Sequence, residues 1–443
     1  MNLNNNKPSA ISYKPIIGLE VHVELKTKSK MFCGCSADYF GKEPNSHTCP
    51  VCLGLPGALP VPNKQAIDWC IKIGLALNCD INEFSKFDRK NYFYPDLAKS
   101  YQISQYDKPF CESGEIILSG NKRIRIRRVH MEEDTGKLIH EGDFSLIDFN
   151  RSGVPLVEIV TEPDFENSTQ VKEYLQKLQQ IVRYLEVSNA DMEKGDMRLE
   201  PNISLSADGS LPNYKVEVKN INSFSFVERA INFEIKRQGE LLEKNETPAQ
   251  ETRGWDEKSQ GTKSQRLKEE ANDYRYFPEP DIPPLKFTEA DIEAIKGSMP
   301  ELPNQKLQRF KSEFSLSVYD SEILTRERTL ADYFEEAVKV GKEHGISPKQ
   351  IANIIINKKI NIDDILPAKI IEMIVEGEKV AEISATELDE IISEVLDENP
   401  KAVEEYKGGK ENALQFLIGQ TMKKIGKKVK IDSVKNAIIK ALN

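Results

Sequence analysis

The short segment from Gly18 to Leu25 combines an apolar face with a face of ionisable side chains. If it forms a strand, residues two apart share a face, and one face then carries Glu20, His22 and Glu24. Carboxylates and an imidazole gathered on one face have the donor chemistry of a site for a hard divalent cation. The alternative is the solvated outer face of an antiparallel sheet, where charged residues are ordinary. The segment by itself leaves both interpretations open.

Two further segments carry carboxylates beside apolar or basic runs. Glu158 lies inside the apolar run GVPLVEIV, and the adjacent acids Glu132 and Glu133 follow a basic, strand-like run. We expect Glu158 to be buried, and a buried charge needs a cation or hydrogen-bond partners to offset its desolvation. Together with Glu20 and His22, such acids would line a mostly oxygen-rich site suited to Mg²⁺ and a polyphosphate. Only one of two adjacent residues can face a given side of a strand, and the pattern does not say which.

Basic residues that could hold phosphates occur in SKFDRKNYFYPD, residues 85–96, where Arg89 and Lys90 precede a tyrosine-rich stretch. The sequence contains neither a GxxxxGK[ST] loop nor a GxGxxG fingerprint, which argues against P-loop, Rossmann and protein-kinase nucleotide sites. The same stretch is also typical of a packed pair of strands. The residues alone therefore leave a nucleotide site as one of two interpretations.

Four of the seven cysteines form two close pairs, Cys33 with Cys35 and Cys49 with Cys52, joined by a loop. Four thiolates in this arrangement match the closed tetrahedral ligand set of a structural zinc ion. We therefore predict zinc at these cysteines, with a reduced, metal-free loop as the alternative. His47 lies between the pairs but would be a fifth ligand. The odd number of cysteines argues against a secreted disulfide framework.

The elements that must position these residues differ along the chain. Residues 13 to about 285 contain short alternating runs separated by turn signals, which predict strands. Apolar periodicity predicts helices within this region at residues 64–77, 168–185 and 226–244. Runs of strands with interspersed helices favour an α+β fold.

Beyond about residue 287 the pattern becomes helical. Capping signals occur at Ser347 and Ser384, each before an amphipathic run. We predict three domains: a large sheet domain carrying the cysteine loop over residues 1–290, a helical domain over 291–372, and a helical tail over 373–443.

Charge and hydropathy limit the classes of protein that this sequence can encode. The chain has 443 residues, a net charge of −10, and no apolar run of membrane-spanning length. Its first residues lack the pattern of a secretory signal, so we expect a cytoplasmic protein that does not bind membranes. The segment from Tyr406 to the C-terminus instead has a net charge of +7, which is compatible with a polyanionic partner or with an ordinary solvated helical surface.

Several longer motifs are specific to one family. The sequence resembles the B subunits of the aspartyl/glutamyl-tRNA amidotransferases from about Pro15 to Pro284 and again in its tail. The motifs that carry this resemblance are IGLEVHVELKTKSKMFC, KFDRKNYFYPDLAKSYQISQYD, HMEEDTGK, NRSGVPLVEIVTEPD, KNINSF, QETRGWDE, DYRYFPEPDIPPL and YKGGKENALQFLIGQTMKK.

The resemblance implies a concrete fold and activity. It implies a mostly antiparallel, glutamine-synthetase-like cradle domain followed by a helical domain and a small YqeY-like tail that binds tRNA. It implies a ligase that uses ATP and Mg²⁺ to phosphorylate the side-chain carboxylate of Glu-tRNA(Gln) or Asp-tRNA(Asn). Ammonia released by an amidase subunit then forms the amide, and a small third subunit completes the heterotrimer.

The resemblance also implies roles for particular residues. By similarity to the family's motifs, Glu20, His22, Glu133 and Glu158 would form the Mg²⁺ site, and Lys90 with Arg89 would face the phosphates of ATP. The four cysteines would keep the zinc ion that some members carry. The alternatives are a tRNA-binding scaffold with a purely structural metal site and a stand-alone metal-dependent phosphohydrolase.

Overall fold

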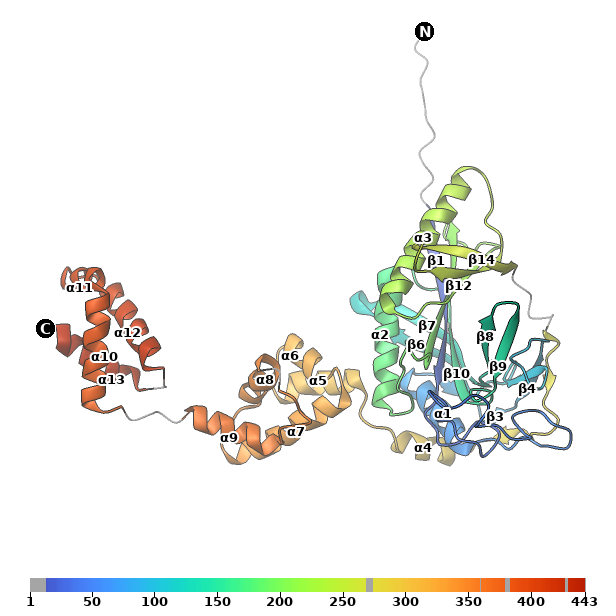
Figure 1. Ribbon diagram of the computed structural model, residues 1–443, viewed down its shortest axis with the longest axis horizontal. Coiled ribbons are helices and arrows are strands. Elements are labelled where there is room, and N and C mark those ends of the chain that lie inside the picture. Colours follow the sequence, from blue (N-terminus) through green and yellow to red (C-terminus); the bar gives the residue numbers. More distant parts are fainter. Residues whose placement is uncertain (1–12, 268–273, 359, 379–382, 427–428, 443) are drawn as a thin grey trace, which may run out of the picture. The chain divides into compact units, whose positions relative to one another are not determined.

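The computed structural model describes residues 13–267, 274–358, 360–378, 383–426 and 429–442 (Figure 1). The chain divides into two compact units, Met1–Pro303 and Asn304–Asn443. None of the helices in the described ranges has both the length and the apolar character that a membrane crossing requires.

A nine-stranded sheet forms the centre of the first unit, in the order β14-β13-β12-β11-β1-β10-β7-β6-β2. Its neighbouring strands pair antiparallel, except that β12 and β13 are parallel. The mostly antiparallel α+β fold is therefore confirmed. The strands are β1 (Lys14–Glu24), β2 (Asp80–Ile81), β6 (Cys111–Ile117), β7 (Arg123–Glu133), β10 (Pro155–Thr161), β11 (Met197–Ser206), β12 (Val216–Lys219), β13 (Glu251–Asp256) and β14 (Gly261–Leu267).

Three helices accompany this sheet: α1 (Lys64–Ala76), α2 (Ser168–Tyr184) and α3 (Phe224–Glu243). The three predicted helices are thus confirmed to within two residues at each end. Each is preceded by an N-cap residue whose side chain accepts a hydrogen bond from a backbone N–H of the first turn, namely Asn63, Asn167 and Ser223.

The alternation along the central strands separates a core face from a polar face. Val21, Val23, Val157 and Ile159 are completely buried and belong to one apolar core together with residues of all three helices. The intervening residues point to the other face, because successive side chains of a strand alternate. Figure 1 places α2 and α3 on one side of the sheet and the β8–β9 hairpin (Lys137–Glu141 and Phe144–Asp148) and β4 (Asp88–Asn91) on the other.

Short strands frame the polar face. A three-stranded sheet has the order β15-β4-β5, and a two-stranded sheet joins β16 to β3. The first unit also has a short 3-10 helix, η1, and ends with α4. The bounds of these elements are β3 (Phe84–Ser85), β5 (Tyr101–Ser104), β15 (Phe277–Pro278), β16 (Leu285–Lys286), η1 (Ser119–Asn121) and α4 (Glu289–Gly297).

The second unit is helical in its described residues and contains two separate clusters of buried apolar residues. The first cluster draws on α5 (Pro303–Glu313), α6 (Val318–Leu324), α7 (Arg328–Glu343), α8 (Pro348–Asn357) and α9 (Pro367–Glu378). The second draws on α10 (Ala385–Glu398), α11 (Pro400–Lys407), α12 (Glu411–Ile425) and α13 (Ile431–Leu442). The predicted caps at Ser347 and Ser384 are present at the starts of α8 and α10.

The predicted domain boundaries can be compared with these groups. The first unit ends at Pro303, and the boundary predicted after residue 372 falls inside α9, whose Ile371 and Ile374 both belong to the first cluster. The division into 1–290, 291–372 and 373–443 stays a prediction.

Candidate functional site

The polar face of the central sheet gathers two histidines and two carboxylates. Cross-strand pairing places His22 of β1 opposite Glu158 of β10, and Glu158 opposite His130 of β7. Glu132 lies two residues after His130 and therefore on the same face. Directly opposite residues of neighbouring strands are close enough for their side chains to interact, so this register builds the cluster.

The distances within this group, which we call the acid–imidazole cluster, are short. Nε2 of His130 lies 3.1 Å from a carboxylate oxygen of Glu158 and 3.6 Å from one of Glu132. Nε2 of His22 lies 3.8 Å from Glu158 and 3.9 Å from Glu132. One ligand atom from each of His22, Glu132 and Glu158 lies within 4.8 Å of the others. Two carboxylates and one imidazole at this spacing could hold a divalent cation.

Glu132 is held in place from neighbouring strands. The Ser104 hydroxyl and the Gln102 amide of β5 donate to its two oxygens at 2.8 and 3.1 Å. Lys90 Nζ of β4 lies 3.7 Å from Glu132 Oε1. Burial alone would raise the pKa of Glu132, but the charges of Lys90 and of the nearby His130 outweigh it and lower that pKa well below its usual range.

Glu158 is also an ionised carboxylate. Burial would raise its pKa, yet the nearby His130 lowers it to about 2. For His130, burial disfavours the protonated ring, but the charge of Glu158 outweighs this and raises its pKa. Both carboxylates are therefore charged at neutral pH and can act as metal ligands.

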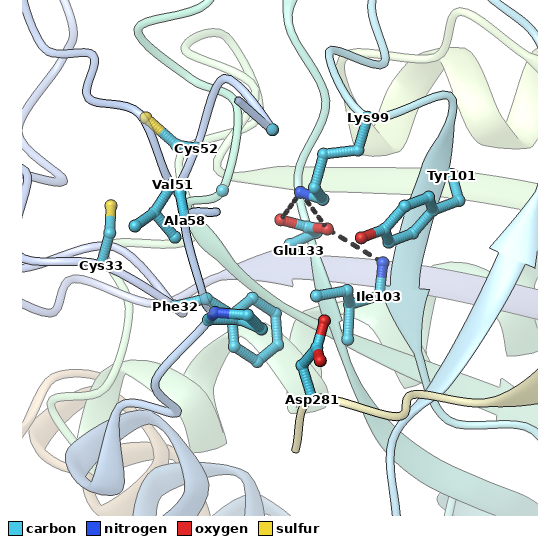
Figure 2. Close-up of a pocket in the computed structure, with 13 residues that line it drawn as sticks. Phe32, Cys33, Val51, Cys52, Ala58, Lys99, Tyr101, Ile103, Glu133 and Asp281 are labelled. Carbon is cyan, nitrogen blue, oxygen red and sulfur yellow. Dashed lines mark hydrogen bonds and ion pairs between the residues drawn. The ribbon is translucent and has the colours of Figure 1, made fainter. Parts of the chain in front are cut away.

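Glu133, the acid that the family motif suggested for the metal site, lies elsewhere. Its oxygens accept from Lys99 Nζ at 2.7 and 2.8 Å and from the Ile103 backbone N–H at 2.9 Å (Figure 2). It lines a cavity of about 70 Å³ together with Lys99 and two of the cysteines, Cys33 and Cys52. The structure thus brings Glu132, and not Glu133, beside His22 and Glu158.

Glu20 belongs to a neighbouring group on the same polar face. It lies two residues before His22 on β1 and opposite Glu200 of β11. Ligand atoms of Glu20, Glu200 and Glu217 lie within 4.8 Å of one another. The Asn202 amide donates to Glu20 at 2.9 Å, so this acid is fixed next to the acid–imidazole cluster without belonging to it.

The two basic residues predicted to face phosphates point in different directions. Lys90 Nζ lies near Glu132 and 5.3 Å from the centre of the Tyr274 ring. Burial opposes its protonation, but the charge of Glu132 outweighs burial and raises the pKa of Lys90 well above its usual range. Arg89 makes a bidentate ion pair with Glu279 at 2.7 and 2.8 Å, so its guanidinium is already occupied.

The four predicted cysteines converge. Their sulfur atoms lie within 4.8 Å of one another, and Cys49 Sγ and Cys52 Sγ are 3.9 Å apart. The Cys49 backbone N–H donates to Cys52 Sγ at 3.2 Å, as expected in a tight turn between paired ligands. This cluster of Cys33, Cys35, Cys49 and Cys52 is consistent with a structural metal site.

The sequence interpretation missed His130 and left Glu132 undecided. The alternation in HMEE carries a signal for both, because residues two apart on a strand share a face. If either His130 or Glu132 lies on the polar face, the other lies there too. The missing information was the pairing of β10 between β1 and β7, which puts that face beside His22.

Comparison with known proteins agrees with the motifs. The family described as the GatB/GatE catalytic domain matches residues 15–293, and a second family, described as GatB domain, matches residues 331–442. The chain is 48% identical to the B subunit of the aspartyl/glutamyl-tRNA(Asn/Gln) amidotransferase of Thermodesulfovibrio yellowstonii, over 93% of this chain and 96% of the relative. It is 46% identical to the B subunits of the same name from Carboxydothermus hydrogenoformans, over 93% and 95%, and from Persephonella marina, over 93% and 96%. With most of its length matched at this identity, and with the acid–imidazole cluster inside the matched catalytic domain, this chain belongs to the GatB/GatE family.

Proposed function

We propose that this chain is the B subunit of a tRNA-dependent amidotransferase, a glutamine-dependent ligase that converts Glu-tRNA(Gln) or Asp-tRNA(Asn) to the amide. In this proposal the first unit phosphorylates the side-chain carboxylate of the attached amino acid with ATP and Mg²⁺. Ammonia from an amidase subunit then displaces phosphate. The observation that carries the proposal is the acid–imidazole cluster beside Lys90 on the face that α2 and α3 leave uncovered.

The residues of the cluster fit a magnesium–nucleotide site. His22, Glu132 and Glu158 offer one nitrogen and up to four oxygens from three strands, a donor set dominated by hard oxygen ligands. When bound, Mg²⁺–ATP would supply the phosphoryl group and part of the charge neutralisation. Lys90 would add a positive charge beside Glu132, where phosphate oxygens would approach the cluster.

The chemistry explains why the site needs no nucleophilic side chain. A free carboxylate is a poor acyl donor because its oxygen is a bad leaving group, and phosphorylation corrects this. Phosphoryl transfer depends mainly on positioning and charge neutralisation, and the substrate carboxylate is itself the nucleophile. His130 would orient Glu158, while Ser104 and Gln102 would orient Glu132.

Three of the predicted site residues take modified roles in this proposal. Glu20, with Glu200 and Glu217, would line the adjoining part of the same surface and add negative charge there. Arg89 would hold the segment around Glu279 against β4 and would not contact phosphate. Glu133 would remain paired with Lys99.

The cysteine cluster would hold zinc in a structural role. A closed set of four thiolates leaves no open coordination position for a substrate, which separates this site from the chemistry.

The partners follow from the activity. Ammonia must come from an amidase subunit that hydrolyses glutamine, and a small third subunit would complete the heterotrimer that uses misacylated tRNA in the cytoplasm. The net charge of +7 between Tyr406 and the C-terminus supports tRNA contact by the tail. Two of its lysines, Lys427 and Lys428, lie outside the described residues, and Lys424 is paired with Glu394 and Glu398 at 2.9 and 2.7 Å.

The alternative is a tRNA-binding scaffold whose metal sites are purely structural. The acid–imidazole cluster disfavours it, because a scaffold gains nothing from two buried, ionised carboxylates gathered in one small cluster.

A near-isosteric substitution separates the two functions. The Glu158→Gln and Glu132→Gln variants would each be assembled with the amidase and the small partner protein and supplied with misacylated tRNA. We expect phosphate release from ATP to fall by about a hundredfold or more, since each change removes a charge aimed at the reacting centre. Binding of tRNA should remain unchanged.

The matched control is Glu141→Gln, the same chemical change at an exposed position of the β8–β9 hairpin. It should leave phosphate release and glutamine hydrolysis at their normal rates. Normal phosphate release by both cluster variants would instead favour the scaffold.

A further inference from the structure

Lys30 lies next to the cysteine cluster and is unusual in its burial. Its side chain is completely buried, with 0% exposed, in a chain whose other lysines are mostly at the surface. Within the described ranges, no carboxylate oxygen lies within 4 Å of Lys30 Nζ. A buried ammonium group without a counter-ion is costly, so its neighbours must offset the charge.

The neighbours of Lys30 Nζ are two carbonyls and a sulfur. The ammonium donates to the His47 carbonyl at 2.8 Å and to the Phe149 carbonyl at 3.2 Å, and it lies 3.8 Å from Cys52 Sγ. Carbonyl dipoles alone solvate an ammonium only in part. Cys52 is therefore the one neighbour that can supply a full negative charge when it is a thiolate.

The backbone of the same residue holds the other cysteine pair. The Lys30 N–H donates to the Cys35 carbonyl at 2.9 Å, so Lys30 contacts both halves of the cluster. Its aliphatic stem also packs near Gly153, where an added Cβ would lie 3.6 Å from Lys30 Cδ and 3.7 Å from Cys52 Cβ. Gly153 has φ +83°, a conformation that glycine adopts without strain and that allows this close approach.

We propose that Lys30 is the internal counter-ion of the metal–thiolate centre formed by Cys33, Cys35, Cys49 and Cys52, an inference that rests on the zinc site proposed above. Four thiolates and one divalent ion leave a net charge of two minus in a partly buried loop. The ammonium of Lys30 offsets part of this charge, and the metal centre in turn allows Lys30 to be buried. Lys30 is thus a positioning residue that stabilises the metal-bound form of the cysteine cluster.

The test measures zinc affinity and does not depend on catalysis. The full chain would be purified as wild type and as Lys30→Gln, Lys30→Arg and Asn150→Ala, and zinc would be titrated against a chromophoric chelator. Glutamine keeps hydrogen-bond donors but removes the charge, whereas arginine keeps the charge. Partners outside the first ligand sphere typically change metal affinity by about 10- to 100-fold, and we expect a loss of this size for Lys30→Gln with recovery in Lys30→Arg.

Asn150→Ala is the matched control for loop tethering. Asn150 is completely buried, accepts the His47 N–H at 2.7 Å and donates to the Glu43 carbonyl at 2.7 Å, so it fixes the same loop without touching sulfur. Its zinc affinity should fall much less than that of Lys30→Gln. An equal fall in both variants would mean that Lys30 acts only as a tether, which overturns the inference.

Two further outcomes separate the inference from the proposed zinc site. If the wild-type chain binds no zinc, the zinc site itself fails and the counter-ion role fails with it. If wild type and Lys30→Gln bind zinc equally well, the site stands and only the role of Lys30 is overturned.

A measurement on the wild-type chain covers the case in which Lys30→Gln does not fold. Amine acylation, mapped by mass spectrometry, would be compared before and after a chelator removes zinc. We expect Lys30 to be protected with zinc bound and to become reactive without it. Protection that is the same in both forms would contradict the proposal, because the burial of Lys30 would then be independent of the metal.

Discussion

His130 and Glu158 face each other across adjacent antiparallel strands, with Nε2 of the imidazole 3.1 Å from a carboxylate oxygen. His130 is only 1% exposed, and its Nδ1 has no hydrogen-bond partner among the described residues. The ring is therefore held by its contacts with Glu158 and Glu132 and by the packing around it. It helps to fix the orientation of both carboxylates.

The first prediction concerns this pair. Replacing His130 by asparagine should weaken the apparent Mg²⁺ affinity of ATP-dependent phosphate release by about 10- to 100-fold, because Glu158 loses the partner that orients it. The Mg²⁺ dependence of phosphate release measures this directly. His140→Asn, at an exposed position of the β8–β9 hairpin, is the matched control and should behave as wild type. An unchanged Mg²⁺ dependence in His130→Asn would remove His130 from the site.

The alternation of the strands was readable from the sequence, but their order in the sheet was not. The period-two pattern of residues 18–25 correctly separated the buried Val21 from His22, and the apolar run around Glu158 correctly predicted the burial of that acid. Local patterns cannot specify that β10 inserts between β1 and β7, because its pairing with β1 joins segments more than a hundred residues apart. The insertion of β10 puts the face of β7 that carries His130 and Glu132 beside His22, so Glu132 joins the cluster and Glu133 does not.

The roles of the two basic residues were also beyond what local sequence patterns can predict. Arg89 and Lys90 are adjacent, and the sequence offers no reason to separate their roles. In the structure they point to opposite sides of β4, and Arg89 meets Glu279, which is 190 residues further along the chain. Helices and the cysteine cluster were easier to predict, since their signals lie within a short stretch.

A second prediction tests the packing that supports the sheet. Leu178 of α2 is completely buried in the main core, so Leu178→Ala should lower the free energy of unfolding of the first unit by about 2–5 kcal/mol. Both tryptophans of the chain, Trp69 and Trp255, lie in this unit, and their fluorescence during guanidinium titration reports its unfolding. Gln176→Ala on the exposed side of α2 should change the free energy by less than about 0.5 kcal/mol. Equal effects of the two changes would contradict the packing described.

A third prediction concerns the ion pair beside the cysteine cluster. Lys99 and Glu133 are 2.7 Å apart, and their side chains are 12% and 4% exposed. Lys99→Met should cost up to about 3 kcal/mol of stability, because it leaves Glu133 charged and largely buried. The double variant Lys99→Met/Glu133→Gln should recover part of this loss, since the unpaired charge is then absent. A double-mutant cycle on thermal or denaturant unfolding measures the coupling, and strictly additive effects would mean that the pair contributes nothing.

The last prediction concerns pH and the buried acid Glu24 at the end of β1. Tyr39 donates its hydroxyl to both Glu24 oxygens at 3.2 and 3.0 Å, and the ionised Asp134 lies nearby, itself paired with Arg198 at 2.7 Å. Burial first, and then the negative charge of Asp134, raise the pKa of Glu24 well above its usual range.

Because the pKa of Glu24 is raised in the folded chain, its titration lowers the free energy of unfolding as pH rises. In the unfolded chain Glu24 releases its proton near its ordinary pKa, whereas in the folded chain it keeps the proton to higher pH. The folded state therefore binds more protons between the two pKa values, and the contribution of Glu24 to stability is lost as pH rises through the folded pKa. Glu24→Gln cannot titrate and should give a melting temperature that falls less than that of wild type from about pH 5 to about pH 9. Glu193→Gln, an exposed control, should follow the wild-type curve, and a Glu24→Gln curve parallel to wild type would show that Glu24 is ionised in the folded chain.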